Sequence, residues 1–158
     1  MKKIIFLAFS LVVLAQVHAQ TKVTKENVQG KWTPVSLNMP GLVYYNIEKD
    51  SLVLGEMMKA QVPDKSQLDG VATMMKSQFA MFAKMYFKFN ADGTAEMNSG
   101  AGEAEPATYT VDEANSTITT VNKEKKTEVI KAEIVNGNLM MTMKQPQTEI
   151  TMALKKAK

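Results

Sequence analysis

The sequence predicts a mainly β protein, an antiparallel up-and-down barrel of about eight strands with a helical segment inserted near residues 51–84. Two patterns support this prediction. After residue 85, apolar and polar residues alternate and turn residues recur at short intervals, which is typical of strands joined by hairpins. Between residues 51 and 84, the apolar residues recur at helical spacing. Because a long antiparallel meander leaves two open edges, we expect it to close into a barrel.

Two strands are expected before the insert. Residues 24–28 predict a short helical turn, and residues 30–39 predict the first strand. Residues 42–47 predict the second strand. Because successive side chains alternate along a strand, Tyr44 and Tyr45 should lie on opposite faces.

The insert is expected to hold two helices. Residues 51–62 predict the first helix, which ends at Pro63. Asp64 is a suitable N-cap for the second helix, with Gln67 in the capping-box position, and the helical spacing continues to Met85. The apolar arc of this helix holds Leu68, Val71, Ala72, Met75, Phe79 and Phe82, is widened on one flank by Met74, Met81 and Met85, and lies opposite lysines that include Lys76 and Lys84.

The part of the chain after the insert predicts seven strands, so that eight or nine are expected in all. The strongest turn signal among them is Asn136-Gly137, which stands between two runs of alternating apolar residues. A type I′ turn needs positive φ at both central residues, and this dipeptide is the one that most favours it. A tight hairpin is therefore expected at residues 136–137.

The first nineteen residues predict a signal peptide. Lys2 and Lys3 form a basic start, residues 4–14 an apolar core, and residues 17–19 a small-residue cleavage site. The apolar run is too short to span a bilayer, which needs about 20 residues, so no transmembrane segment is expected. We expect cleavage after Ala19, export to the periplasm or beyond the cell, and one mature domain over residues 20–158.

Several residue types on which enzymes rely are absent. The chain has no cysteine, all 19 basic residues are lysine, and the single histidine, His18, leaves with the signal peptide. Cysteine chemistry, imidazole acid–base catalysis and histidine metal ligation are therefore excluded from the mature chain. The acidic residues fall mostly in turns or at outward strand positions, so no catalytic pair of carboxylates is indicated. The sequence predicts no enzyme, no catalytic residue, no metal site and no cofactor.

The mature chain is close to neutral in charge. Removal of Lys2 and Lys3 leaves 17 lysines against 16 acidic residues, a net charge of +1, and the lysines are scattered along the chain. A nucleic-acid surface concentrates positive charge, so binding to nucleic acid is not expected.

The mature chain also carries 12 methionines, which can be interpreted in more than one way. As flexible apolar side chains they can fill an irregular core or line an adaptable binding pocket. As thioethers they are also suitable ligands for copper(I), and Met81 and Met85, at i and i+4, have a workable spacing for that ion, with Met74 nearby.

Two stretches of the chain resemble the lipocalins. The run Asn27-Val28-Gln29-Gly30-Lys31-Trp32 resembles the opening signature of that family, a helical turn followed by Gly-x-Trp at the start of the first strand. Residues 87–94, followed by repeated hairpins, are similar to small exported lipocalin-like domains of Gram-negative bacteria. The resemblance covers residues 28–154 without the insert.

This resemblance implies an up-and-down barrel in which Gly30 and Trp32 plug the closed end, with a hydrophobic ligand in the open end. The chain also departs from the family pattern. Lipocalins place an arginine late in the barrel over that tryptophan, and Lys155 is the nearest substitute here. Lipocalins also place their helix after the barrel, whereas the helices of this chain are inserted early.

The leading hypothesis is a binding module whose barrel mouth, partly covered by the second helix, holds a small hydrophobic or amphipathic ligand. The alternative is a structural or protein-interaction barrel with a filled interior, which would meet an unknown partner through the Met74, Met81 and Met85 flank. Interior volume separates the two, since a carrier needs a cavity of ~300 Å³ or more. The candidate ligand contacts are Met75, Phe79, Phe82, Phe87, Phe89, Tyr109, Met141 and Met143.

Overall fold

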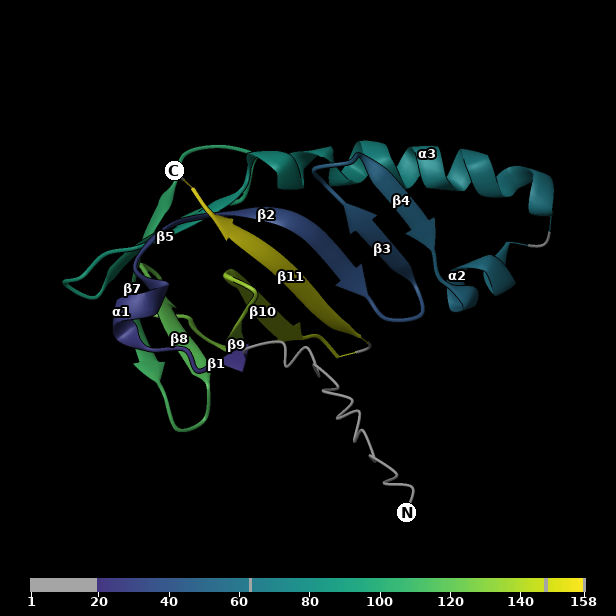
Figure 1. The fold of residues 1–158 in the computed structure, drawn as a ribbon. Coiled ribbons are helices and arrows are strands. Elements are labelled where there is room, and N and C mark those ends of the chain that lie inside the picture. The colour runs from purple at the N-terminus through teal and green to yellow at the C-terminus, as the bar shows by residue number, and fades with distance from the viewer. Residues whose placement is uncertain (1–19, 63, 147, 158) are drawn as a thin grey trace, which may run out of the picture.

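The computed structural model describes residues 20–62, 64–146 and 148–157, and shows a mainly β chain with a helical insert (Figure 1). The predicted signal peptide, residues 1–19, lies outside the described residues. The elements in chain order are β1 Gln20–Thr21, α1 Lys25–Val28, β2 Gly30–Met39, β3 Val43–Asn46, β4 Ser51–Leu54, α2 Glu56–Gln61, the 3-10 turn η1 Lys65–Gln67, α3 Leu68–Phe79, the 3-10 turn η2 Ala80–Lys84, β5 Tyr86–Phe89, β6 Thr94–Asn98, β7 Glu105–Asp112, β8 Thr117–Asn122, β9 Thr127–Val135, β10 Asn138–Lys144 and β11 Glu149–Lys156.

Eight of the strands close into an antiparallel barrel. Strands β5 to β11 pair in sequence order, β5 pairs with β2, and β11 pairs with β2 on its other edge. The predicted barrel of about eight strands is therefore confirmed, and so are the seven strands after the insert. Closure leaves no open edge in this ring, because every strand of the ring has a neighbour on both sides.

Strand β2 is longer than the barrel needs, and its second half carries a hairpin. Residues 30–32 pair with β5, whereas residues 36–39 pair on the same side with β3, which in turn pairs with β4. The β3–β4 hairpin therefore extends the barrel wall beyond the start of β5. In Figure 1, α3 runs along this hairpin, and the two extend away from the end of the molecule that holds α1.

The closed end of the barrel is built around Trp32. Its indole Nε1 donates a hydrogen bond of 2.6 Å to the carbonyl of Val28 in α1, and its ring is buried. The ammonium of Lys156 lies 5.4 Å from the centre of the indole ring. Gly30 has φ +113°, and a Cβ there would lie 2.7 Å from Cε of Lys156. Glycine is thus favoured here by its positive φ, and a larger residue would also push aside the flexible end of the Lys156 side chain.

Lys156, and not Lys155, takes the position over the tryptophan. Lys156 is the register partner of Trp32 on β11, so the two side chains share a face of the wall. Lys155 points to the opposite face, where its ammonium lies 3.2 Å from the carboxylate of Glu48. The choice of Lys155 from the sequence is therefore wrong by one residue, because it was made without the register of β11 against β2.

The first predicted helix is also partly wrong. Ser51–Leu54 is strand β4, and only Glu56–Gln61 of the expected residues 51–62 are helical. Asp50 has φ +45° and turns the chain back, so that Leu54 pairs with Val43 of β3. The helical insert therefore begins at α2 instead of at residue 51.

The second predicted helix begins with a 3-10 turn, and its α-helical part ends early. The carboxylate of Asp64 accepts a hydrogen bond of 2.8 Å from the backbone N–H of Ser66, so Asp64 is an N-cap as predicted, but of the 3-10 turn η1. The α-helix itself begins at Leu68, and Gln67, the residue expected in the capping box, precedes it without a side-chain capping bond. Helix α3 ends at Phe79, and residues 80–84 continue as the 3-10 turn η2 instead of reaching Met85 as α-helix.

The faces of the strands follow the sequence pattern. Tyr45 is buried and Tyr44 is exposed, as alternation predicted. At the expected hairpin, Asn136 and Gly137 have φ +52° and +79°, the signs that a type I′ turn requires. The local signals in the sequence thus placed these elements correctly.

The Asn136-Gly137 turn provides a test of backbone strain without steric crowding. No atom lies within 4 Å of a Cβ built at Gly137, so Gly137→Ala should destabilise the protein only through its positive φ, by about 1–2 kcal/mol. Gly70, in α3, has equally open surroundings without a positive φ. Gly70→Ala should instead stabilise by about 0.5–1 kcal/mol, because glycine weakens a helix interior. Urea unfolding of both variants measures the contrast, and equal shifts would contradict it.

A second test concerns the closed end. Trp32→Ala should leave a cavity and lower the free energy of unfolding by roughly 3–5 kcal/mol. Trp32→Phe keeps an aromatic ring but loses the hydrogen bond to Val28, so its loss should be smaller. Since Trp32 is the only tryptophan, far-ultraviolet circular dichroism is the suitable probe. An unchanged unfolding free energy for Trp32→Ala would show that the ring does not support the barrel.

Candidate functional site

The end of the barrel opposite Trp32 is ringed by apolar side chains that are only partly buried. Strand β2 runs from Trp32 to this end, and antiparallel pairing brings the ends of β6 and β10 and the start of β11 to it. The 3-10 turn η2, which contacts β2, completes the ring. We call the following the mouth residues, since each packs against the buried core and keeps part of its surface exposed: Met39, Phe79, Phe82, Met85, Met97, Met143 and Ile150.

The mouth residues come from both strands and helix. Met143 and Ile150 are register partners on β10 and β11. The rings of Phe79 and Phe82 pack edge to face, with centroids 5.6 Å apart. Four of the seven are methionines, whose flexible thioether side chains adapt to differently shaped neighbours.

The eight contacts predicted from the sequence fall into distinct places. Phe79, Phe82 and Met143 are mouth residues, and Phe87 and Met141 are buried in the core on strands that lead to the mouth. Met75 lies on α3 and is partly buried, but it is outside the core cluster.

Phe89 and Tyr109 lie at the closed end instead of the mouth. Phe89 pairs with Gly30 at the start of β2, and its ring lies 4.9 Å from that of Tyr109. The hydroxyl of Tyr109 donates a hydrogen bond of 2.9 Å to the carbonyl of Asn90. These two rings therefore form part of the packed interior at the closed end, which we call the floor of the barrel.

Four mouth residues were missed by the sequence analysis as ligand contacts: Met39, Met85, Met97 and Ile150. Each stands at or near the end of a strand or just before one. The predicted direction of each strand of the meander shows which strand ends share a rim, so this signal was present in the sequence.

The inner layers of the barrel are filled by side chains. Ile118, Leu139 and Met141 have no measurable exposure, and Ile130, Met152 and Leu154 have 2% or less. These inner layers are therefore closely packed, whereas the mouth residues keep part of their apolar surface in contact with solvent.

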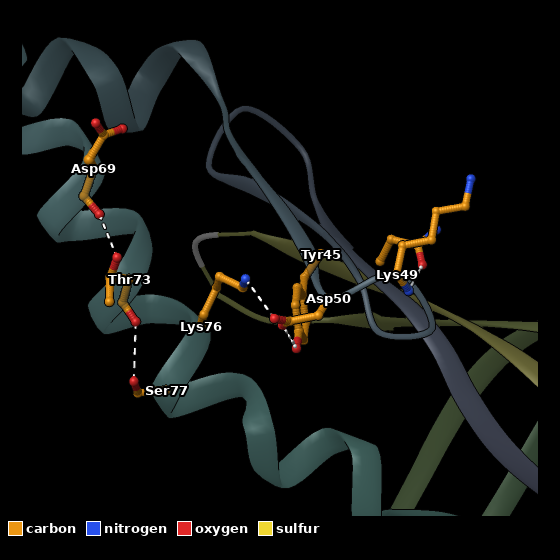
Figure 2. Close-up of polar contacts among 8 residues, drawn as sticks. Tyr45, Lys49, Asp50, Asp69, Thr73, Lys76 and Ser77 are labelled. Carbon is orange, nitrogen blue, oxygen red and sulfur yellow. Dashed lines mark hydrogen bonds and ion pairs between the residues drawn. The ribbon is translucent and has the colours of Figure 1, made fainter.

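A polar network joins the helix to the hairpin above the mouth (Figure 2). The hydroxyl of Tyr45 on β3 donates a hydrogen bond of 3.0 Å to Oδ1 of Asp50. The ammonium of Lys76 on α3 lies 2.7 Å from Oδ2 of the same carboxylate. The ring of Tyr45 also lies 5.9 Å from that of Phe79, so polar and apolar contacts meet at one point of the helix.

The position of Lys76 corrects the sequence analysis. The helical wheel placed Lys76 with Lys84 on the face away from the apolar contacts. Lys84 is exposed, but Lys76 bonds to Asp50 on the β3–β4 hairpin. The wheel could not show this, because the hairpin that lies beside this flank was not in the predicted arrangement.

The network shifts the titration of its own members. The hydrogen bond from Lys76, followed by that from Tyr45, lowers the pKa of Asp50 below its ordinary value of 3.8. Burial, followed by the hydrogen bond to Asp50, raises the pKa of Tyr45 above 10.0. Asp50 is therefore negatively charged, and Tyr45 is protonated, at neutral pH.

A groove of about 520 Å³ lies on the outer face of strands β8 to β11. Its lining mixes hydroxyl groups, such as those of Thr117 and Thr142, with side chains of both charges, such as Lys131 and Glu149. The groove is therefore mixed in polarity, whereas the mouth residues are all apolar.

Neither a metal-binding cluster of acidic or histidine side chains nor a membrane-spanning helix occurs among the described residues. Residues 20–62, 64–146 and 148–157 contain no group of three or more histidine, aspartate or glutamate side chains placed to hold a metal. Within the same ranges, no helix combines the length and apolar character needed to cross a membrane. For the copper(I) interpretation, Met85 packs against the core, whereas Met74 and Met81 are 56% and 46% exposed on the insert.

The fold and the mouth define a class of protein, a mainly β chain with a closed eight-stranded antiparallel barrel and a helical insert, which is consistent with a lipocalin-like fold. Comparison with protein-family models, with curated proteins and with solved structures finds no match for this chain.

The titration of Asp50 provides a test of the polar network. Carbon-13 NMR of the carboxyl groups should show a midpoint for Asp50 below 3.8. Lys76→Met should raise this midpoint more than Tyr45→Phe does, because the bond from Lys76 is the larger cause. Since the folded-state pKa is the lower one, the network's contribution to stability is complete above the unfolded-state pKa and is lost as pH falls through the folded-state value. A midpoint that neither variant moves would contradict the geometry.

Proposed function

We propose that this chain is a non-enzymatic, lipocalin-like binding domain that takes the apolar part of a small hydrophobic or amphipathic ligand at the barrel mouth. The observation that supports the proposal is the set of mouth residues, seven apolar side chains that pack on the core yet keep solvent access. Binding would remove this apolar surface from water, which favours association by roughly 25 cal/mol per Å².

The packing of the barrel limits how such a ligand would bind. Because Ile118, Leu139 and Met141 fill the inner layers, the ligand is proposed to sit among the mouth residues and not deep in the barrel. One side of the ligand would then remain near solvent. This arrangement suits an amphipathic molecule, whose polar part stays hydrated while its apolar part is covered.

The remaining parts of the proposal rest on the sequence. The first nineteen residues have the pattern of a signal peptide, so we propose that the domain works in the periplasm or outside the cell. Without cysteine or, after cleavage, histidine, the mature chain lacks the side chains that most often serve as nucleophile and general base. We therefore propose binding without catalysis, and no cofactor or nucleic-acid partner.

A second candidate function is a protein-interaction barrel without a small ligand. The filled inner layers favour this alternative, and so does the exposure of Met74 and Met81 on the insert. Exposed methionines are frequent at surfaces that bind several partners, because their side chains repack easily. The two candidates differ in whether the mouth takes up an apolar molecule.

Binding of N-phenyl-1-naphthylamine, a neutral fluorophore that brightens in apolar surroundings, tests the leading proposal. The chain over residues 20–158 should bind it, and Phe82→Ala should weaken binding more than tenfold, which corresponds to about 1.4 kcal/mol. Lys84→Ala, two residues away on an exposed position, is the matched control and should leave binding unchanged.

Circular dichroism must show that both variants remain folded. Native mass spectrometry of protein purified from the cell envelope should also detect a bound apolar molecule. If the folded parent protein takes up neither a probe nor a native molecule, the interaction barrel is the better proposal. Equal binding by the parent and the Phe82 variant would place the site away from the mouth.

A further inference from the structure

Helix α3 is attached to the rest of the molecule by few contacts. Not one residue of α2, η1, α3 or η2 is fully buried. The contacts of α3 with the hairpin include the ring of Phe79 against Tyr45 and the ion pair of Lys76 with Asp50. Segments with little buried apolar surface open at lower free energy than the core does. Helix α3 should therefore open more readily than the barrel strands beneath it.

The two ends of this segment are held differently. At η2, an added Cβ at Gly100 would overlap the carbonyl of Met81, so the loop after β6 presses directly on this turn. The Phe82 ring also packs on the core, and η2 contacts β2. At the start of α3, Gly70 faces open space, with no neighbour within 4 Å of an added Cβ, and Leu68 and Val71 are only partly buried.

The helical geometry changes where the anchored and the free parts meet. The chain passes from α-helix at Phe79 to 3-10 turn at Ala80. A 3-10 turn at the C-terminus of a helix has poorer hydrogen-bond geometry than the α-helix before it, so this junction is the more easily deformed point of the segment. Opening would therefore move α3 about this junction while η2 stays in place.

The Asp50 carboxylate bridges the hairpin and the helix, as Figure 2 shows. One oxygen accepts from Tyr45 and the other contacts Lys76, so both oxygens are used. The backbone N–H of Asp50 is also bonded to the carbonyl of Ile47, 3.3 Å away, within the tight turn of the hairpin. The carboxylate is thus held in place by the hairpin and presented to the helix.

We propose that α3 is a lid over the barrel mouth, hinged at the junction of α3 and η2 and held closed by the bridge of Tyr45, Asp50 and Lys76. The purpose of the lid rests on the proposed function, since opening would separate α3 from Tyr45 on the hairpin and widen that side of the mouth for a ligand. The side chain of Lys76 is 35% exposed and that of Asp50 is 69% exposed. Water competes for an ion pair at such exposure, so the bridge can break and re-form without unfolding the barrel.

Hydrogen exchange followed by mass spectrometry tests the lid without any ligand. Lys76→Met keeps the length of the side chain and removes its charge, and Asp50→Asn suits the positive φ of that position, which asparagine tolerates. In both variants the amides of residues 71–79 should exchange about two- to fivefold faster, as expected for loss of a weak contact. The amides of β5 and β8 should keep their rates.

Lys59→Met is the matched control. Its ammonium lies 2.7 Å from Glu56, the same distance as in the bridge, but both residues belong to α2. This substitution should leave the exchange of residues 71–79 unchanged. If neither Lys76→Met nor Asp50→Asn changes that exchange, the bridge does not hold the helix. Acceleration of α3 together with β5 and β8 would mean that the helix opens only when the barrel does, which also overturns the lid.

A kinetic measurement separates the lid from the proposed function. In stopped-flow mixing with N-phenyl-1-naphthylamine, the association rate constant should rise by about the same two- to fivefold in the Lys76 and Asp50 variants, and not in the Lys59 variant. Identical association rates in all variants would show that α3 does not gate the mouth. If the variants accelerate exchange in α3 alone but the protein binds no probe, the proposed ligand site is refuted. The hinge and the bridge that holds α3 would still be established by the exchange data.

Discussion

The pairing of strand β2 with three other strands holds this molecule together. One edge of β2 pairs with β11 over residues 32–38 and thereby closes the barrel. The other edge pairs with β5 over residues 30–32 and with β3 over residues 36–39. Because β2 spans both ends of the barrel, it carries Trp32 at the closed end and Met39 at the mouth. The plug, the closure and the rim of the mouth therefore depend on one strand.

The division of the β2 edge also explains why a helix is needed at the mouth. Since β3 occupies the second half of that edge, β5 pairs only with the first half. The part of the barrel wall that β5 forms therefore starts farther from the mouth. Phe79, Phe82 and Met85 complete the rim where a longer β5 would have run. The β3–β4 hairpin, which occupies the second half of the β2 edge, also presents Asp50 to α3. The pairing of β3 with β2 therefore both shortens the β5 wall and supplies the contact that holds the helix beside it.

The contrast between the floor and the mouth limits the ways in which the barrel can work. Toward the closed end, the rings of Phe89 and Tyr109 pack against each other and Leu154 is fully buried, and such interiors resist insertion of further atoms. At the mouth, methionines and two phenylalanines, one of them the last residue of α3, are partly exposed. A surface of this kind can change its neighbours at low cost, whether the new neighbour is a small molecule or a protein. Adaptability is thus confined to one end, while the rest of the barrel supplies rigidity.

The sequence by itself determined the elements whose signals are local. The seven strands after the insert, the faces of Tyr44 and Tyr45 and the Asn136-Gly137 turn all follow from alternation and turn chemistry, which act over a few residues. The plug at Trp32 was available from the turn and the Gly-x-Trp run before β2. For the site, Phe79, Phe82 and Met143 could be chosen because they lie on apolar faces that point toward a shared interior.

Only the tertiary structure decided features that depend on register or on a neighbouring element. Ser51-Leu52-Val53-Leu54 fits a helix as well as a strand, and it becomes β4 because Asp50 turns it back onto β3. The lysine over Trp32 and the partner of Lys76 were likewise fixed by which residues on other strands stand opposite them. A one-residue change of register exchanges the two faces of a strand, and periodicity alone leaves that register undetermined.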